Sequence, residues 1–309
     1  MDNLTSFKII TGECNLLNIA LNSSKENVAE LERIKMKLLD EYNSYNAKIY
    51  SLNSMPSESI FKDVSNERDD KGNDKIFLKN RELMTNFYEK PPSKLNNELV
   101  KRRYEHGLIK CPYCGYPEAP DTLDHFMPKG NWPEFALFHN NLVPQCEGCA
   151  PTKGERYFSD EENLVKFIHP FYFDLLTKIN FKIVTDFENN TNTISFNLEI
   201  NLDEDMEDND IKRIKLHFKE LKIKGKLISF CQKEFLHWKR LLEKKNFDIK
   251  ESFNTRLNEQ LDDEILKNWR TAFFKSLLEQ TNLIEKIKTD SFNFINNTDI
   301  EILTINKYN

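Results

Sequence analysis

Four of the six cysteines in this chain fall into two C-x-x-C pairs, Cys111 with Cys114 and Cys146 with Cys149. Two such pairs can present four thiolates, which is the ligand set that zinc takes in tetrahedral structural sites. Gly115, directly after the first pair, suits the tight turn of a zinc knuckle. Six cysteines in 309 residues are too few for a disulfide scaffold, so the spacing predicts one structural Zn²⁺.

The overall composition is typical of a globular protein with a packed core. Hydrophobic residues make up 39% of the chain, which contains 23 phenylalanines, so enough apolar surface is present to bury a core. The net charge of −6 argues against a surface that coats nucleic acid by overall basicity, but it allows a local basic face. Cys14 and Cys231, outside the pairs, are expected to be ordinary half-buried thiols.

The sequence contains neither a membrane span nor an export signal that we can recognise. No run approaches the ~18 consecutive apolar residues that a membrane helix needs. The first ten residues, MDNLTSFKII, lack the basic start and long apolar stretch of a signal peptide. We therefore expect a cytoplasmic protein that does not associate with membranes.

Residues 23–50 are predicted to form a long helix. Ser23 and Glu26 have the spacing of a capping box at its start. Apolar side chains form one stripe along this helix. The stripe favours a helix packed on its own domain; contact with a partner protein or with a second copy of the chain is the alternative. The apolar side chains that form it, spaced by threes and fours, are Val28, Leu31, Leu38, Tyr42, Tyr45 and Ile49.

The remaining regions predict an α+β, helix-rich protein. The proline-containing stretch EKPPSK, residues 89–94, is the best candidate for a linker. Apolar and polar residues alternate over 181–187 and 193–200 around ENNTN, which predicts a β-hairpin. The last hundred residues are predicted to be helical. They include a lysine stripe at helical spacing, formed by Lys212, Lys215, Lys219, Lys222 and Lys226.

Between the cysteine pairs lies LDHF, in which Asp124 and His125 are neighbours. An aspartate offers a hard oxygen ligand, and a histidine offers a base that titrates near neutral pH. Alone, this dipeptide carries little information. Here it is followed in order by NNLVPQC, by the second cysteine pair and by Lys153 with a glycine after it.

This ordered set of motifs resembles the HNH endonucleases, whose ββα-metal fold carries two zinc-knuckle cysteine pairs beside the active site. The resemblance covers about residues 105–175, roughly a quarter of the chain. It implies that His125 is the general base that activates water and that Asp124 binds a catalytic Mg²⁺ or Mn²⁺ ion. It also implies that Asn141 orients the histidine and that Lys153 lies near the phosphate backbone.

Position 150 departs from the family pattern. The family places an Asn or His metal ligand directly after the last cysteine, where this chain has Ala150. We favour an engineered substitution, because every other motif position is intact. A naturally inactive variant is one alternative, and replacement of the missing ligand by Glu147 or His169 is another. With Asp124 as its main protein ligand, the site is expected to bind a catalytic ion weakly.

Several neighbouring residues have simpler interpretations. His139 is expected to pack or to form hydrogen bonds, and His169 is expected to lie away from the active site. Trp132 and Phe135 are expected in the core. The basic stretch KRRY, residues 101–104, is the best candidate for contact with a nucleic-acid backbone, which carries no base information.

The sequence thus predicts a metal-dependent HNH endonuclease that cleaves DNA. It would comprise a mainly helical N-terminal region (1–95), an HNH zinc-knuckle nuclease domain (96–175) and a hairpin-plus-helices region (176–309). The flanking regions resemble in arrangement the HNH subunits of Septu-type phage-defence systems, which implies an ATPase partner subunit; a homo-oligomer is the other assembly we consider. The alternatives are a non-catalytic zinc-knuckle protein that binds nucleic acid or acts as an adaptor, and a nuclease that acts on RNA.

Overall fold

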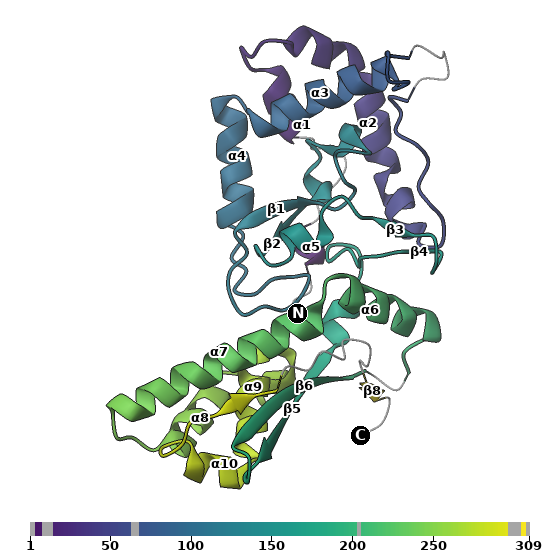
Figure 1. Ribbon diagram of the computed structural model, residues 1–309. Coiled ribbons are helices and arrows are strands. Elements are labelled where there is room, and N and C mark those ends of the chain that lie inside the picture. The colour runs from purple at the N-terminus through teal and green to yellow at the C-terminus, as the bar shows by residue number, and fades with distance from the viewer. Residues whose placement is uncertain (1–3, 8–14, 63–67, 203–204, 296–303, 307–309) are drawn as a thin grey trace. The chain divides into compact units, whose positions relative to one another are not determined.

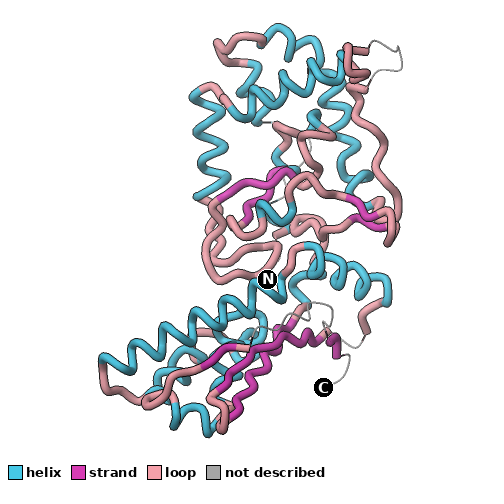
Figure 2. The backbone as a smooth tube through the Cα atoms, in the orientation of Figure 1, coloured by secondary structure: helices cyan, strands magenta, loops and turns pink. Residues whose placement is uncertain are grey.

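The computed structural model describes residues 4–7, 15–62, 68–202, 205–295 and 304–306. Over these ranges the protein is mixed α+β and rich in helix, and its strands form small sheets (Figure 1, Figure 2). The chain divides into two compact units. Of the described residues, the N-terminal unit contains those within 4–113 and 119–174, and the C-terminal unit contains 114–118 and those from 175 onward.

The predicted long helix is confirmed as α2 (Val28–Tyr50), and its buried side chains follow the predicted stripe: Leu31, Leu38, Tyr42, Tyr45 and Ile49. The ring of Tyr42 stacks on that of Phe138, with 4.4 Å between the ring centroids. The helix therefore packs on its own unit. The described segments of this unit before the cysteines also form the 3-10 helix η1 (Thr5–Phe7), α1 (Asn15–Leu21), α3 (Lys75–Glu89) and α4 (Ser93–Tyr104).

The predicted start of α2 is wrong. The helix begins at Val28, and no side chain caps it, because the preceding Asn27 adopts a left-handed conformation with φ of 68°. The Ser23 hydroxyl instead donates a hydrogen bond to the carbonyl of Ala20, at 2.6 Å. Ser23 and Glu26 thus belong to the turn between α1 and α2.

Helices α3 and α4 have clear local causes. The Asp74 carboxylate accepts a hydrogen bond from the backbone N–H of Phe77 at 2.9 Å, which caps α3. Pro91 and Pro92 separate α3 from α4 within the N-terminal unit, because proline cannot donate the backbone hydrogen bond that would continue a helix.

Two short strands, β1 (Thr122–His125) and β2 (Leu142–Gln145), pair antiparallel and place His125 opposite Leu142. The loop between them carries the 3-10 helices η2 (Pro133–Phe135) and η3 (His139–Asn141), and α5 (Ala150–Lys153) follows the second cysteine pair. A second pair, β3 (Phe158–Ser159) and β4 (Leu164–Val165), lies further along. Most residues from 124 to 146 are buried, so this small strand–strand–helix element forms a packed core.

The predicted hairpin is confirmed as β5 (Asn180–Glu188) and β6 (Thr193–Asn201), which pair antiparallel. Two short strands, β7 (Asn293–Phe294) and β8 (Thr304–Asn306), pair parallel with β6. On one face, Phe196 of β6 packs against Phe235 and Phe273. The helices of this unit are η4 (Leu175–Lys178), α6 (Asp208–Glu220), α7 (Ile223–Lys244), α8 (Ile249–Leu257), η5 (Asp262–Lys267), α9 (Trp269–Leu278) and α10 (Thr281–Lys286).

The prediction of one continuous lysine stripe is wrong. Helix α6 ends at Glu220 and α7 begins at Ile223, and Lys222 between them adopts a left-handed conformation with φ of 53°. Cys231, in α7, is fully buried, and Cys14 lies outside the described residues. In the part of the chain that the structure describes, no helix is both long and apolar enough to cross a membrane.

Candidate functional site

The four paired cysteines come together as predicted. The Sγ atoms of Cys111, Cys114, Cys146 and Cys149 all lie within 4.8 Å of one another, and all four residues are buried. Tetrahedral zinc with Zn–S bonds of about 2.3 Å requires sulfur atoms roughly 3.8 Å apart. The cluster could therefore hold a zinc ion after small side-chain adjustments.

The backbone around the first cysteine pair has the geometry of a metal knuckle. The N–H of Tyr116 donates to the Cys114 sulfur at 3.4 Å. Gly115 has a φ of +79°, and a Cβ there would lie 3.1 Å from the indole nitrogen of Trp269 and 3.2 Å from the Phe181 ring. The position therefore requires glycine for both its backbone conformation and its close packing.

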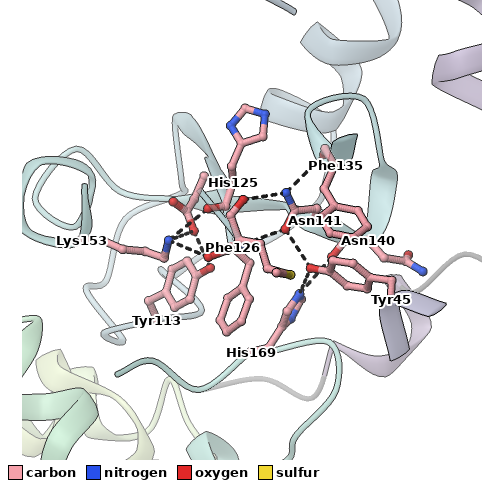
Figure 3. Close-up of polar contacts among 11 residues, drawn as sticks. Tyr45, Tyr113, His125, Phe126, Phe135, Asn140, Asn141, Lys153 and His169 are labelled. Carbon is pink, nitrogen blue, oxygen red and sulfur yellow. Dashed lines mark hydrogen bonds and ion pairs between the residues drawn. The ribbon is translucent and has the colours of Figure 1, made fainter. Parts of the chain in front are cut away.

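Asp124 forms a buried ion pair with Lys153. Its Oδ2 atom lies 3.1 Å from the Lys153 ammonium and accepts a 2.7 Å hydrogen bond from the Tyr113 hydroxyl (Figure 3). The ammonium also donates to the backbone carbonyls of His125 and Phe126, each at 3.1 Å. Three acceptors thus match the three protons of the ammonium. Lys153 is fully buried, so its charge lies inside the protein and not at the surface.

The pair is coupled across two elements, because Asp124 belongs to β1 and Lys153 ends α5. Burial raises the pKa of Asp124, and the nearby Lys153 charge opposes that rise. Burial lowers the pKa of Lys153, and the Asp124 charge opposes that fall. Each group therefore depends on the other to remain charged inside the protein.

The His125 imidazole lies on the other side of β1. In Figure 3 its ring points away from Lys153 and Tyr113. Its Nε2 atom is 3.1 Å from the carbonyl oxygen of Ala136, which can only accept, so Nε2 carries the proton and Nδ1 keeps a free lone pair. The Tyr88 ring meets it edge-on, with 4.3 Å between centroids. Burial lowers the pKa of His125 to about 3, so the ring is neutral at neutral pH.

Asn141 ties together the two backbone segments around His125. Its Oδ1 atom accepts from the N–H of Met127 at 2.8 Å, and its Nδ2 atom donates to the carbonyls of Met127 and Phe135 at 3.0 and 3.2 Å. Its own carbonyl accepts from the N–H of Phe126 at 2.8 Å. Asn141 is fully buried and thus holds the chain directly after His125.

His169 packs beside this network, with its ring centroid 4.2 Å from that of Phe126, but both of its ring nitrogens are already engaged. The His169 Nδ1 atom accepts from the N–H of Phe171 at 3.2 Å, so its Nε2 atom carries the proton and donates to the Asn140 carbonyl at 2.9 Å. His169 therefore has no lone pair to offer a metal. Burial lowers the pKa of His139 to about 4.

Trp132 and Phe135 lie in the core, as predicted from the sequence. The Trp132 indole N–H donates to the carbonyl of Ser57 at 3.0 Å, and the Phe135 ring meets that of Tyr45 edge-on. Both aromatic side chains therefore serve packing.

Sequence comparisons link a part of the chain to a phage protein. A stretch of 80 residues is 35% identical to "Protein ea31" of Escherichia phage lambda, and it covers 24% of this chain and 26% of that protein. The chain thus spans about a quarter of the relative that it matches. No protein-family profile matches the chain, and no solved structure does.

The residues around Asp124 do not fit the catalytic divalent ion that the HNH resemblance implies. One carboxylate oxygen is committed to the Lys153 ammonium and the Tyr113 hydroxyl, and the ammonium would repel a second cation. Ala150, the first residue of α5, offers no ligand atom. A divalent ion would therefore meet one carboxylate oxygen beside a positive charge, which is a poor site for Mg²⁺.

Two tyrosines of this site have no place in the motif pattern. Tyr113 lies between the first two cysteines. Tyr45 lies in the buried stripe of α2, where the sequence pattern predicts only a core residue. A buried tyrosine hydroxyl is usually hydrogen-bonded, so the sequence could predict that each hydroxyl has a partner. It does not say which partner.

Proposed function

We propose that the chain is an HNH-type endonuclease that hydrolyses phosphodiester bonds of DNA, with a catalytic site that is incomplete at position 150. The observation that carries the proposal is the His125 imidazole, held by the Ala136 carbonyl through Nε2 so that Nδ1 remains a proton acceptor. The strand–strand–helix element around it and the adjacent four-cysteine cluster support the same proposal.

In the proposed reaction, water attacks the phosphorus atom while His125 Nδ1 takes its proton, the ester P–O bond on the opposite side breaks, and the departing nucleotide alkoxide takes a proton from solvent. The neutral imidazole is ready to accept that proton, but its low pKa makes it a weak base in the free protein. A phosphodiester anion beside the ring would stabilise the imidazolium and raise its pKa toward neutrality. The Ala136 carbonyl would fix the ring and stabilise the proton on Nε2 throughout.

Arg103 is the proposed phosphate contact beside His125. Its guanidinium is half-exposed and hydrogen-bonds the hydroxyl of Tyr88, the same side chain whose ring meets the His125 imidazole. Arg102, by contrast, is committed to the carbonyls of His139 and Leu142 at 3.0 and 3.1 Å. The two adjacent arginines therefore have different roles, one structural and one open to a ligand.

We expect Arg103→Gln to weaken binding of duplex DNA and to reduce the slope of log affinity against log salt by about one, because one phosphate contact is lost. Fluorescence anisotropy with a labelled duplex measures both quantities. Lys101→Gln is the matched control, since Lys101 is exposed on the same helix and pairs with Glu98. Equal effects of the two substitutions would argue against a specific role for Arg103.

The central test restores a ligand at position 150. We expect Ala150→Asn to raise cleavage of supercoiled plasmid in Mg²⁺ or Mn²⁺ by at least about tenfold, because it supplies the oxygen donor that the HNH pattern places directly after the last cysteine. Adding His125→Ala to this variant should abolish the gain. Ala150→Leu controls for side-chain size, because it offers no donor.

Absence of cleavage in every variant would reject catalysis and favour the second candidate function, a zinc-knuckle module that binds nucleic acid without cutting it. One observation favours this candidate: the Asp124 carboxylate is already neutralised by Lys153. Parallel assays on plasmid and on single-stranded RNA distinguish the two nuclease substrates. The ATPase partner subunit and the role in phage defence rest on the sequence resemblance alone and are part of the proposal.

A further inference from the structure

We propose that Tyr45, on helix α2, is a positioning residue for the His125 imidazole, which makes α2 part of the hydrolytic site. This inference rests on the proposed function. Helix α2 lies outside residues 105–175, the segment that carries the HNH resemblance. The site would therefore depend on a part of the chain that the motif does not include.

The link runs through the side chain of Asn141. The Tyr45 hydroxyl donates to Asn141 Oδ1 at 2.8 Å, and the same oxygen accepts from the N–H of Met127 (Figure 3). The two Nδ2 protons go to the carbonyls of Met127 and Phe135. Every hydrogen-bonding position of the amide is thus used, and Tyr45 supplies the bond that comes from outside the segment.

Both supports of His125 depend on this amide. Met127 lies two residues after His125, so its position fixes the backbone that leads away from the imidazole. Phe135 precedes Ala136, whose carbonyl holds the imidazole Nε2 atom. A shift of the Asn141 amide would therefore move the backbone of His125 and the carbonyl that orients its ring.

Tyr45 itself is held rigidly. It is fully buried, and its ring meets those of Phe135 and Phe138 edge-on at 4.9 and 5.0 Å between centroids. Its hydroxyl also lies 3.5 Å from His169 Nε2, whose proton is donated to the Asn140 carbonyl. The hydroxyl proton is thus free to point to Asn141. Because it is buried, Tyr45 cannot touch a substrate and can act only through this chain of contacts.

The test compares Tyr45→Phe with Tyr172→Phe in the Ala150→Asn protein. Both substitutions remove one hydroxyl that bonds near the middle of the unit, but Tyr172 bonds the side chains of Asn46 and Asn140 and not that of Asn141. We expect Tyr45→Phe to lower kcat for plasmid cleavage about tenfold with KM unchanged, because misplacement of the base affects the chemical step. Tyr172→Phe should leave kcat within about twofold.

A second readout does not require activity. In the protein labelled with ¹⁵N-histidine, the ring nitrogens of His125 should show the tautomer protonated at Nε2. We expect Tyr45→Phe to broaden these signals or to mix in the other tautomer, and Tyr172→Phe to leave them unchanged. His125→Ala assigns the signals.

The two readouts separate the possible results. A fall in kcat together with a changed His125 signal, both specific to Tyr45→Phe, supports the inference. An unchanged His125 signal overturns it, as do equal losses of kcat and thermal stability in both tyrosine variants, which would indicate an ordinary packing role. A changed His125 signal without cleavage in any variant supports the contact chain and rejects the proposed function.

Discussion

Loss of zinc from the four-cysteine cluster is expected to unfold the region around β1, β2 and α5. Structural zinc contributes about 10–16 kcal/mol of apparent binding free energy in small zinc domains. The free energy lost when zinc is removed can therefore exceed the whole free energy of unfolding of a domain. The cluster joins residues far apart in the sequence, since Cys111 and Cys146 belong to pairs separated by the entire β1–β2 loop. Without the ion, the metal–sulfur bonds that would join these distant segments are lost.

Elemental analysis should give one zinc per chain, and a strong chelator should lower the thermal midpoint by more than about 10 °C. Cys146→Ser should reproduce the chelator effect and lose the zinc. Cys231→Ala is the matched control, because Cys231 is also buried but is not one of the four clustered cysteines. A zinc content and thermal midpoint that survive Cys146→Ser would contradict the predicted site.

Lys153→Met is expected to destabilise the protein by about 3–5 kcal/mol. The substitution keeps the length and apolar character of the side chain but leaves the buried Asp124 carboxylate without its cation. Adding Asp124→Asn should recover a large part of the loss, because the uncompensated charge is then gone. Urea unfolding monitored by circular dichroism measures the free energy of unfolding of the parent protein, of Lys153→Met and of the double variant.

Acidification provides an independent check on Lys153→Met. Burial raises the pKa of Asp124 above its ordinary 3.8, so the folded variant binds a proton at a higher pH than the unfolded chain does. The deficit relative to the parent protein should therefore shrink as the pH falls from 7 toward that raised pKa. Lys62→Met, which removes an exposed pair with Glu58, should change stability by less than about 1 kcal/mol. A comparably small loss for Lys153→Met would show that the buried pair contributes little.

Local periodicity predicted the elements whose pattern lies within one segment. The α2 stripe and the alternation in β5 and β6 were both confirmed, because the spacing of apolar residues within one continuous segment determines which face is buried. The start of α2 and the lysine stripe were wrong for a shared reason. Asn27 and Lys222 each adopt a left-handed backbone conformation. Because neither position is a glycine, the sequence did not predict that conformation.

The candidate site was only partly predictable. The cysteine spacing was sufficient to predict the cluster, because a metal site imposes its own ligand pattern. The environment of Lys153 was not, since its three acceptors lie on residues 27 to 29 positions earlier in the chain. Whether a lysine faces solvent or closes a buried network depends on tertiary packing, which no short motif records.

The contact between Tyr45 and Asn141 sets a limit on how this protein could be rearranged by recombination. The segment with the HNH resemblance begins near residue 105, yet its central asparagine bonds a side chain located 96 positions earlier. If residues 105–175 were moved alone into another protein, Asn141 would lose a buried partner, and the Phe135 and Phe138 rings would lose the aromatic surface of α2. The structural unit is therefore larger than the motif: a transfer that keeps the surroundings of Asn141 intact has to include α2 or a host helix with an equivalent tyrosine.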